Sequence, residues 1–303
     1  MKDKYLIIRI LGNDLPGLHG NNQTINNLEF TLKNEYNFFQ TDKIYILNRI
    51  VDISKKNKII KLLESYCAKY IDIPFDMTVF KKIPKLELTI NDVKKLELSH
   101  DWKHKGTYEE VSKVIKGMSD YNLYLINNNK SRNFAINYGK KNGYKWTFVL
   151  DSNNYILKEC FENIVNNLDD KTEYIILSQK RLHDKNLKNN VLLNDGYSIT
   201  NQLINHEPQI AFKNTSTIFF NPNIPYGLSP KAELINSFCI KGPWNNWMTF
   251  FGLNIKPRKF LNVNYQILSF VIRLDANDKN NNTRNNFMNR WLGLYKIINS
   301  LTQ

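Results

Sequence analysis

One carboxylate stands at the end of an apolar segment near the middle of the chain. The stretch KWTFVLDSNN runs from Lys145 to Asn154 and changes abruptly from bulky apolar residues to Asp151, Ser152 and two asparagines. An aromatic and β-branched run of this kind predicts a buried strand. Asp and Asn are ordinary turn residues, but their oxygens are also ligands for a metal ion or a polar substrate. This stretch alone leaves both interpretations open.

Two earlier apolar segments end in polar residues in the same way. YLIIRIL is followed by Asn13 and Asp14 after one glycine, and KIYILNRIVD carries Asn48, Arg49 and Asp52 toward its end. The carboxyl ends of parallel strands meet at one edge of a sheet, where open α/β sheets bind their ligands. We therefore expect these strand ends to meet Asp151 at one crevice, the alternative being three unrelated turns.

A predicted helix precedes the strand that ends at Asp151. Its sequence SRNFAINYG places Arg132 and Asn133 in the first turn. A guanidinium offers five donors to a phosphate, and the N–H groups of a helix N-terminus add positive potential. The alternative is an ordinary solvated helix start.

The elements that position these residues alternate between strand and helix. Helical patterns cover Thr24–Glu35, with Thr24 as the expected N-cap, as well as 57–70, Lys130–Gly143, 158–168 and 285–301. Strand patterns cover 5–14, Lys43–Asp52, 173–182, 208–214, 216–222 and 266–274. Between them, Asp76–Gly117 has the pattern of an insertion of turns and short helices.

This alternation predicts a doubly wound α/β fold. The later strands follow one another at shorter intervals, so we expect part of the sheet to be antiparallel. The last pattern predicts a C-terminal helical extension.

Composition limits the class of protein. The chain has 303 residues, 42% of them hydrophobic and 13% aromatic, which is typical of a folded globular protein. Its three cysteines are widely spaced and form no C-x-x-C pair, which favours a reducing compartment. No apolar run reaches the roughly 20 residues of a membrane-spanning helix. We therefore expect a cytoplasmic protein with no transmembrane segment.

The formal net charge of +14 raises the question of nucleic-acid binding. The lysines are dispersed and accompanied by many asparagines and isoleucines, as in DKNNNTRNNF, a bias that an AT-rich genome would impose. We expect no nucleic-acid partner, but a positive field that attracts phosphorylated ligands.

The pattern R-N-x-A-I-x-x-G from Arg132 to Gly139, six further residues and a strand ending in L-D-S-N together resemble a known family. The resemblance is to the nucleotide-sugar half of GT-A fold glycosyltransferases, in which an R-N helix leads to a strand that ends in a D-x-D motif. It covers roughly residues 5–155. The chain is also similar to an uncharacterised group that shares ILGNDLP, NRIVD and EPQIAF.

The resemblance implies a GT-A-like (Rossmann-type) mixed sheet flanked by helices. The catalytic domain would span residues 1–260, with a nucleotide-sugar half at 1–155 and an acceptor half at 156–260. Residues 261–303 would add a strand and a helix to the same domain.

The resemblance also implies site residues. Asp151 and Asn153 occupy the first and third D-x-D positions and would hold Mn²⁺ or Mg²⁺. Arg132 and Asn133 would face the diphosphate, and the polar ends of the two earlier strands would face the nucleoside. An Asn at the third position brings no charge, so metal affinity should be weaker. The other possibility is a metal-independent site in which basic residues neutralise the diphosphate.

The implied activity is transfer of a hexosyl group from a nucleotide-sugar, with a UDP-sugar favoured, to a hydroxyl of a glycan, protein or small molecule. Such a transfer needs a base if it inverts configuration. Glu207, in NHEPQIAF, is the first candidate and Asp184 the second, the alternative being exposed loop acids. Trp244 could stack on a sugar or simply pack in the core.

Two other classes of function stay open. One is a non-catalytic module that binds a nucleotide-sugar, which Asn153 suggests. The other is a basic polyanion-binding protein.

Overall fold

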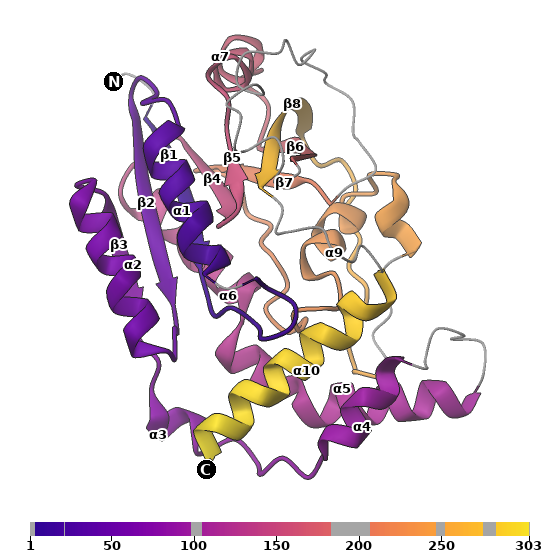
Figure 1. Cartoon of the computed structure of the whole chain (residues 1–303). Helices are drawn as coiled ribbons and strands as arrows, with labels where there is room; N and C mark the ends of the chain where they lie inside the picture. The colour runs from indigo at the N-terminus through magenta and orange to yellow at the C-terminus, as the bar shows by residue number, and fades with distance from the viewer. Residues whose placement is uncertain are drawn as a thin grey trace.

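The computed structural model describes residues 4–20, 22–97, 105–182, 207–246, 252–274 and 283–302. Its centre is one eight-stranded sheet in the order β3-β2-β1-β4-β7-β6-β8-β5. Helices cover both faces of this sheet, and the C-terminal helix α10 crosses the end of the molecule near α4 and α5 (Figure 1). The expected mixed α/β class with a C-terminal helix is confirmed.

The first half of the sheet is parallel. Strands β1, β2, β3 and β4 run side by side, with β1 between β2 and β4. The elements of this half are β1 (Tyr5–Leu11), α1 (Gln23–Asn34), β2 (Thr41–Asn48), α2 (Ile53–Ser65), β3 (Lys69–Ile73), α3 (Met77–Phe80), α4 (Ile90–Lys94), η1 (Lys95–Glu97), α5 (Lys105–Leu125), α6 (Asn128–Lys141) and β4 (Trp146–Asp151). The chain thus builds outward from β1 to β3 and then returns to the other side of β1.

The second half of the sheet mixes strand directions, as expected. Strand β7 is antiparallel to both β4 and β6, β8 is parallel to β6, and the short β5 is antiparallel to β8. The elements are β5 (Asn154–Tyr155), α7 (Lys158–Asn167), β6 (Tyr174–Leu182), β7 (Gln209–Lys213), α9 (Pro230–Ser237), η3 (Pro243–Asn246), β8 (Tyr265–Leu274) and α10 (Thr283–Thr302). Strand β8 lies inside the sheet, between β6 and β5.

Alternating residues of the central strands face two different cores. Leu6, Ile8 and Ile10 of β1 pack with residues of α6 and α9. Tyr5 and Ile7 pack on the opposite face with residues of α7, and Leu11 packs there with α1 and α2. Period-two alternation therefore places α6 and α9 on one face of the sheet and α1, α2 and α7 on the other.

A third apolar cluster lies beyond the sheet. It joins α3, α4, α5 and α10 through residues such as Phe80, Val111 and Trp291. Gly293 of α10 has no room for a side chain, because an added Cβ would lie 2.8 Å from Leu15 Cβ in the loop after β1. The C-terminal helix therefore packs directly against that loop.

Most predicted elements are present, with three corrections. Helix α1 begins after Asn22, and Thr24 lies inside it, where its hydroxyl donates to Asp14, so the predicted N-cap is wrong. Residues 216–222 form no strand in the described structure. The region 76–117 includes the start of the 21-residue helix α5 as well as short helices. No helix in the described ranges is long and apolar enough to cross a membrane.

Candidate functional site

A close helix–strand contact determines where Arg132 and Asp151 meet. A Cβ added to Gly139 of α6 would lie 1.9 Å from Thr147 Oγ1 of β4, so only glycine allows this approach. Arg132 lies seven residues before Gly139 on the same helix face, about 10 Å along the axis. Asp151 lies four residues after Thr147 on the same strand face, about 13 Å along. The two side chains therefore converge at the carboxyl end of β4.

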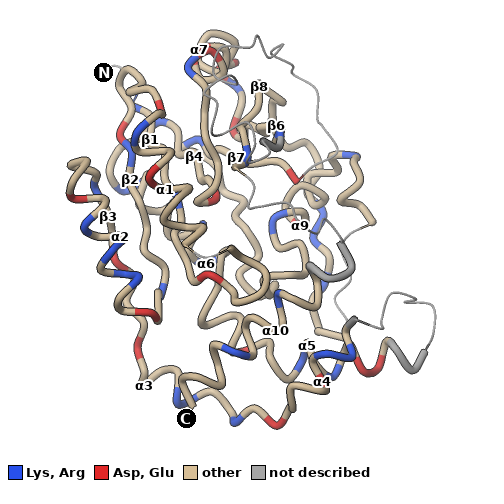
Figure 2. The backbone as a smooth tube through the Cα atoms, in the orientation of Figure 1, with Lys and Arg blue, Asp and Glu red and all other residues tan. Residues whose placement is uncertain are grey.

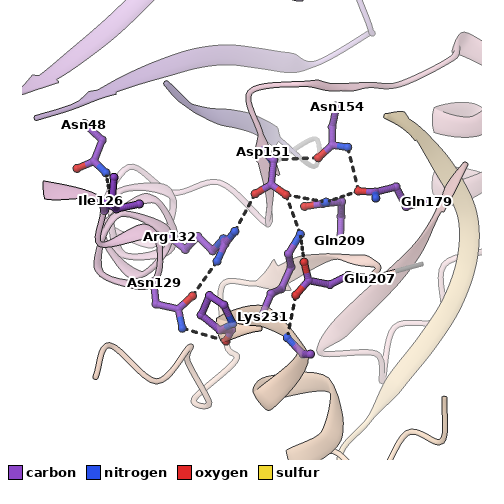
Figure 3. Close-up of polar contacts among 12 residues, drawn as sticks. Asn48, Ile126, Asn129, Arg132, Asp151, Asn154, Gln179, Glu207, Gln209 and Lys231 are labelled. Carbon is purple, nitrogen blue, oxygen red and sulfur yellow. Dashed lines mark hydrogen bonds and ion pairs between the residues drawn. The ribbon is translucent and has the colours of Figure 1, made fainter. Parts of the chain in front are cut away.

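Two cations hold the Asp151 carboxylate. Arg132 donates to Asp151 Oδ1 at 2.8 Å, and the Lys231 ammonium donates to Oδ2 at 2.8 Å (Figure 3). Arg132 also donates to Asn129 Oδ1 at 2.8 Å, and its guanidinium lies over the Phe220 ring. The Arg132–Asp151 contact agrees with the placement expected from the sequence.

Glu207 joins the same group from the other half of the chain. Its Oε2 lies 3.7 Å from Lys231 Nζ, and its Oε1 accepts from the backbone N–H of Ala232 in the first turn of α9 at 3.2 Å. The Lys231 ammonium therefore lies between two carboxylates (Figure 3). We call Arg132, Asp151, Glu207, Gln209 and Lys231 the Asp151 cluster.

Amide side chains fix the rest of the arrangement. Gln209 Nε2 donates to Asp151 Oδ2 at 3.2 Å and to Gln179 Oε1 at 2.9 Å. Asn154 donates to Gln179 Oε1 at 3.2 Å and accepts from the Asp151 N–H at 3.1 Å. Arg9 holds the same turn from β1 by donating to the Asn154 carbonyl at 2.9 Å. The carboxylate is therefore held on a pre-organised turn.

The cations of the cluster are buried, whereas the side chains of its acids are partly exposed. The side chains of Lys231 and Arg132 are 2% and 5% exposed, whereas those of Asp151 and Glu207 are 30% and 27% exposed. Burial by itself would raise the pKa of Asp151, but Lys231 and Arg132 outweigh it and hold that pKa well below its usual value. Asp151 therefore stays ionised, and its side chain is partly exposed.

The polar residues after β1 and β2 form a second group at the same edge of the sheet. Asn13 donates to the carbonyls of Arg49 and Leu125 and accepts from the Val51 N–H. Asn48 donates to the Ile126 carbonyl and accepts from Arg49. These two amides tie the loops to the end of α5.

The acids of this second group contact residues of helices α1 and α2. Asp14 accepts from Thr24 of α1 and pairs with Lys55 of α2. Asp52 caps α2 by accepting from the Lys55 N–H at 3.0 Å. We call Asn13, Asp14, Asn48, Arg49 and Asp52 the β1–β2 turn cluster. In Figure 3, Asn48 and Ile126 lie apart from the group around Asp151.

Four further predicted residues have other surroundings. Asn133 makes a two-way bridge to the backbone of Phe220. Asn153 donates to the Leu274 carbonyl at the end of β8. Trp244 is 1% exposed and donates to the Ile240 carbonyl, so it packs in the core and offers no face to a sugar. Asp184 lies outside the described residues.

The donor set at Asp151 does not suit a divalent cation. Both carboxylate oxygens of Asp151 accept hydrogen bonds from cationic side chains, which occupy the positions that a metal ion would need. Among the described residues no group of three or more His, Cys, Asp or Glu side chains is arranged to hold a metal ion. Ligands for Mn²⁺ or Mg²⁺ would have to be oxygens released from these contacts. We therefore derive no step through a metal.

Lys231, Gln209 and Gln179 were not predicted from the sequence. Lys231 follows the first residue of α9, in SPKAELIN, where a lysine would ordinarily be solvated. Gln209 and Gln179 each stand within a strand, and both are 1% exposed or less. A polar residue inside an apolar strand is a usable signal, because a buried amide must find partners. The position of Lys231 carries no comparable local signal.

Comparison with known proteins gives no activity for this chain. No protein-family model matches it. The chain is similar to an uncharacterised protein of Plasmodium falciparum (isolate 3D7), with 23% identity over an alignment of 330 residues that covers 85% of this chain and 20% of the relative. The chain therefore spans about a fifth of the length of that relative.

Proposed function

We propose that this protein is a glycosyltransferase with a GT-A-like fold, which moves a hexosyl group from a nucleotide-sugar, with a UDP-sugar favoured, to a hydroxyl acceptor. The observation that carries the proposal is the Asp151 cluster. It joins two carboxylates and two cations from α6, β4, the segment before β7, and α9 at the carboxyl end of β4.

The position in the sheet supports a ligand site. The chain places β2 and β3 on one side of β1 and β4 on the other, so the direction of winding reverses between β1 and β4. Open α/β sheets bind ligands outside the carboxyl ends of the strands at such a switch point. Asp151 ends β4 there and pairs in register with Ile10 of β1.

The residues of the cluster match the charge changes of glycosyl transfer. The bond between the anomeric carbon and the diphosphate oxygen breaks, and its electron pair leaves with the nucleoside diphosphate. The acceptor oxygen forms the new bond to the anomeric carbon, and its proton passes to a base. The transition state resembles an oxocarbenium ion, as in glycoside hydrolysis.

The four charged residues of the Asp151 cluster then have roles. Arg132 and Lys231 supply positive charge for the departing diphosphate. The hydrogen bonds of Arg132 to Asn129 and Asp151 use two of the five N–H donors of a guanidinium. Asp151, whose side chain is partly exposed, would accept from sugar hydroxyls. Glu207 is the candidate base because its side chain is partly exposed and is held in direction by Lys231 and Ala232.

The β1–β2 turn cluster has a supporting role in this proposal. Its side chains are bound mainly to backbone groups and helix ends, so they shape the loops beside β1 rather than contact the reacting atoms. The nucleoside would lie against these loops, in the half formed by residues 1–155. The acceptor would lie on the side of residues 156–260.

The proposal is tested by measuring release of nucleoside diphosphate and transfer of the sugar with a panel of nucleotide-sugars and hydroxyl acceptors. Glu207→Gln should reduce kcat by a factor of about 10² to 10⁴ while donor binding is retained. Glu162→Gln, an exposed acid on α7 paired with Lys158, is the matched control and should leave turnover unchanged. Absence of binding and turnover with every donor would overturn the proposal.

A second candidate function is a module that binds a nucleotide-sugar without chemistry. It is favoured by the mutual pairing of Asp151, Arg132 and Lys231, which leaves every charge of this trio satisfied. Saturable binding of a nucleotide-sugar, with no hydrolysis and no transfer of the sugar to any acceptor tested, would support it.

Polyanion binding is the weaker alternative. In Figure 2 the Lys and Arg positions are spread over most of the helices and strands, with Asp and Glu among them. A dispersed distribution gives a general positive field rather than a binding stripe. Binding to duplex DNA that falls steeply with ionic strength would support this alternative, and a weak or flat salt response would dismiss it.

A further inference from the structure

We propose that the Lys231 ammonium takes the place between Asp151 and Glu207 that a divalent cation would otherwise occupy, so that the site works with a built-in cation. The inference concerns a residue that the sequence did not single out. Its ligand, a nucleoside diphosphate linked to a sugar, rests on the proposed function, whereas the role of the lysine rests on geometry.

The ammonium is placed as a shared counter-charge. Lys231 Nζ lies 2.8 Å from Asp151 Oδ2 and 3.7 Å from Glu207 Oε2, and the side chain is only 2% exposed (Figure 3). Arg132 holds the other oxygen of Asp151 at 2.8 Å. Each acid thus lies beside the buried Lys231 ammonium.

The backbone on both sides of Lys231 is tied to the same site. The carbonyl of Pro230 accepts from Asn129 at 3.0 Å, and Asn129 in turn accepts from Arg132. The N–H of Ala232 donates to Glu207. Pro230 is therefore held through Asn129, a partner of Arg132, and Ala232 is held by Glu207. These contacts on both sides keep the Lys231 ammonium in place.

The positions of Lys231 and Arg132 disfavour binding of a divalent cation at Asp151 and supply positive charge in its place. A divalent cation at Asp151 would lie close to two fixed positive groups in a partly buried setting, where repulsion is strong. An ammonium carries three donors and one positive charge, and the guanidinium beside it adds a second charge. Together they supply the positive field that a diphosphate leaving group requires.

Removing the ammonium should create a metal site. Lys231→Met keeps a long unbranched side chain but leaves Asp151 and Glu207 facing each other without their shared cation. Oxygen ligands of this kind bind Mn²⁺. Lys56→Met is the matched control, because it removes one positive charge from α2, where Lys56 forms a more exposed pair with Asp72 of β3.

The experiment measures the unfolding temperature of the wild type and both variants with excess Mn²⁺ and with EDTA. We expect Mn²⁺ to raise the Tm of Lys231→Met by about 2–4 °C at saturation and to leave the wild type and Lys56→Met unchanged. Adding Asp151→Asn to Lys231→Met should abolish the shift. A folded Lys231→Met variant that ignores Mn²⁺ would overturn the inference.

A second measurement on the wild type decides the question even if Lys231→Met does not fold. A panel of nucleotide-sugars is titrated in EDTA and again in Mn²⁺, with unfolding temperature as the readout. Equal stabilisation in both conditions supports the built-in cation. Stabilisation that requires Mn²⁺ overturns it while the proposed transferase stands, whereas no stabilisation by any donor overturns the proposed function instead.

Discussion

The β1–β2 turn cluster and the Asp151 cluster occupy the same edge of the sheet and draw on similar residue types, yet they are built differently. In the turn cluster, Asn13 and Asn48 hydrogen-bond to backbone groups and Asp52 caps a helix. In the Asp151 cluster, charged side chains from distant parts of the chain contact one another, and the acids stay partly exposed. Polar strand ends therefore form two classes, one that fixes loops and helix ends and one in which charged side chains from distant segments contact one another.

The largest effect is expected from removing the central acid. Asp151→Ala leaves Arg132 buried without its counter-charge and Lys231 with only Glu207 at 3.7 Å, so we expect a loss of about 3–5 kcal/mol in the free energy of unfolding. Urea denaturation measures it. Asp72→Ala, which breaks a more exposed pair with Lys56, should cost no more than about 1 kcal/mol. Equal losses would contradict the claim that Asp151 neutralises two buried cations.

The next effect compares the pH dependence of stability from His19, in the loop that carries Asn13 and Asp14, with that from Asp151. Burial, with Arg290 and Arg273 nearby, lowers the pKa of His19 in the loop after β1 to about 4. Because the unfolded chain binds this proton near pH 6.5, stability is full above that value and falls as the pH is lowered toward 4, by up to about 3 kcal/mol.

The measurement compares the free energy of unfolding at pH 7.5 and 4.5. His19→Asn keeps an acceptor for the Leu15 N–H and should lose most of this dependence. The depressed pKa of Asp151 acts only below its usual value, so its own contribution is lost at still lower pH. An unchanged pH dependence in His19→Asn would contradict the assignment.

A smaller effect tests how the Asp151 cluster is positioned. Gly139→Ala places a Cβ against Thr147 Oγ1, and we expect a loss of about 2 kcal/mol from overpacking. Thr147→Ala removes the obstructing atom, so the double variant should recover part of the loss. Thermal or urea unfolding of the four proteins gives the coupling energy. Strictly additive effects would show that the helix–strand contact does not set the register.

The smallest effect is expected from the helix cap of the turn cluster. Asp52→Ala should cost about 1 kcal/mol by leaving the first turn of α2 uncapped. Stabilisation by a nucleotide-sugar, measured as the rise in Tm, should remain. Loss of that stabilisation would mean that Asp52 belongs to the ligand site and that the two clusters are less distinct than their contacts indicate.

Local pattern was enough for most of the fold. Strand and helix periodicity identified β1, β2, β4, β6, β7 and β8 and the helices α1, α2, α6, α7 and α10. It failed at 216–222, where an apolar stretch packs as irregular loop: Ile218 donates to the Tyr174 hydroxyl, and Phe220 bonds to Asn133. Tertiary partners decided that segment, and periodicity does not report them.

The site was predictable where chain neighbours meet and not where distant segments meet. Arg132 and Asp151 lie nineteen residues apart within one helix–strand unit, so their contact follows from local geometry. Lys231 reaches Asp151 across eighty residues, through the packing of α9. Arg9, alone in an apolar strand, was a usable signal, because a buried charge requires a partner, and it contacts Glu35.

The most direct test of the central claim is calorimetric titration of a nucleotide-sugar panel into the wild type, Arg132→Lys and Lys56→Met, first in EDTA and then with excess Mn²⁺. Arg132→Lys keeps the charge that faces Asp151 but loses the planar fork of donors. We predict that one donor binds the wild type and Lys56→Met with equal affinity and binds Arg132→Lys at least about tenfold more weakly. Binding of equal strength to all three proteins, or to none of them, would contradict a nucleotide-sugar site at Asp151.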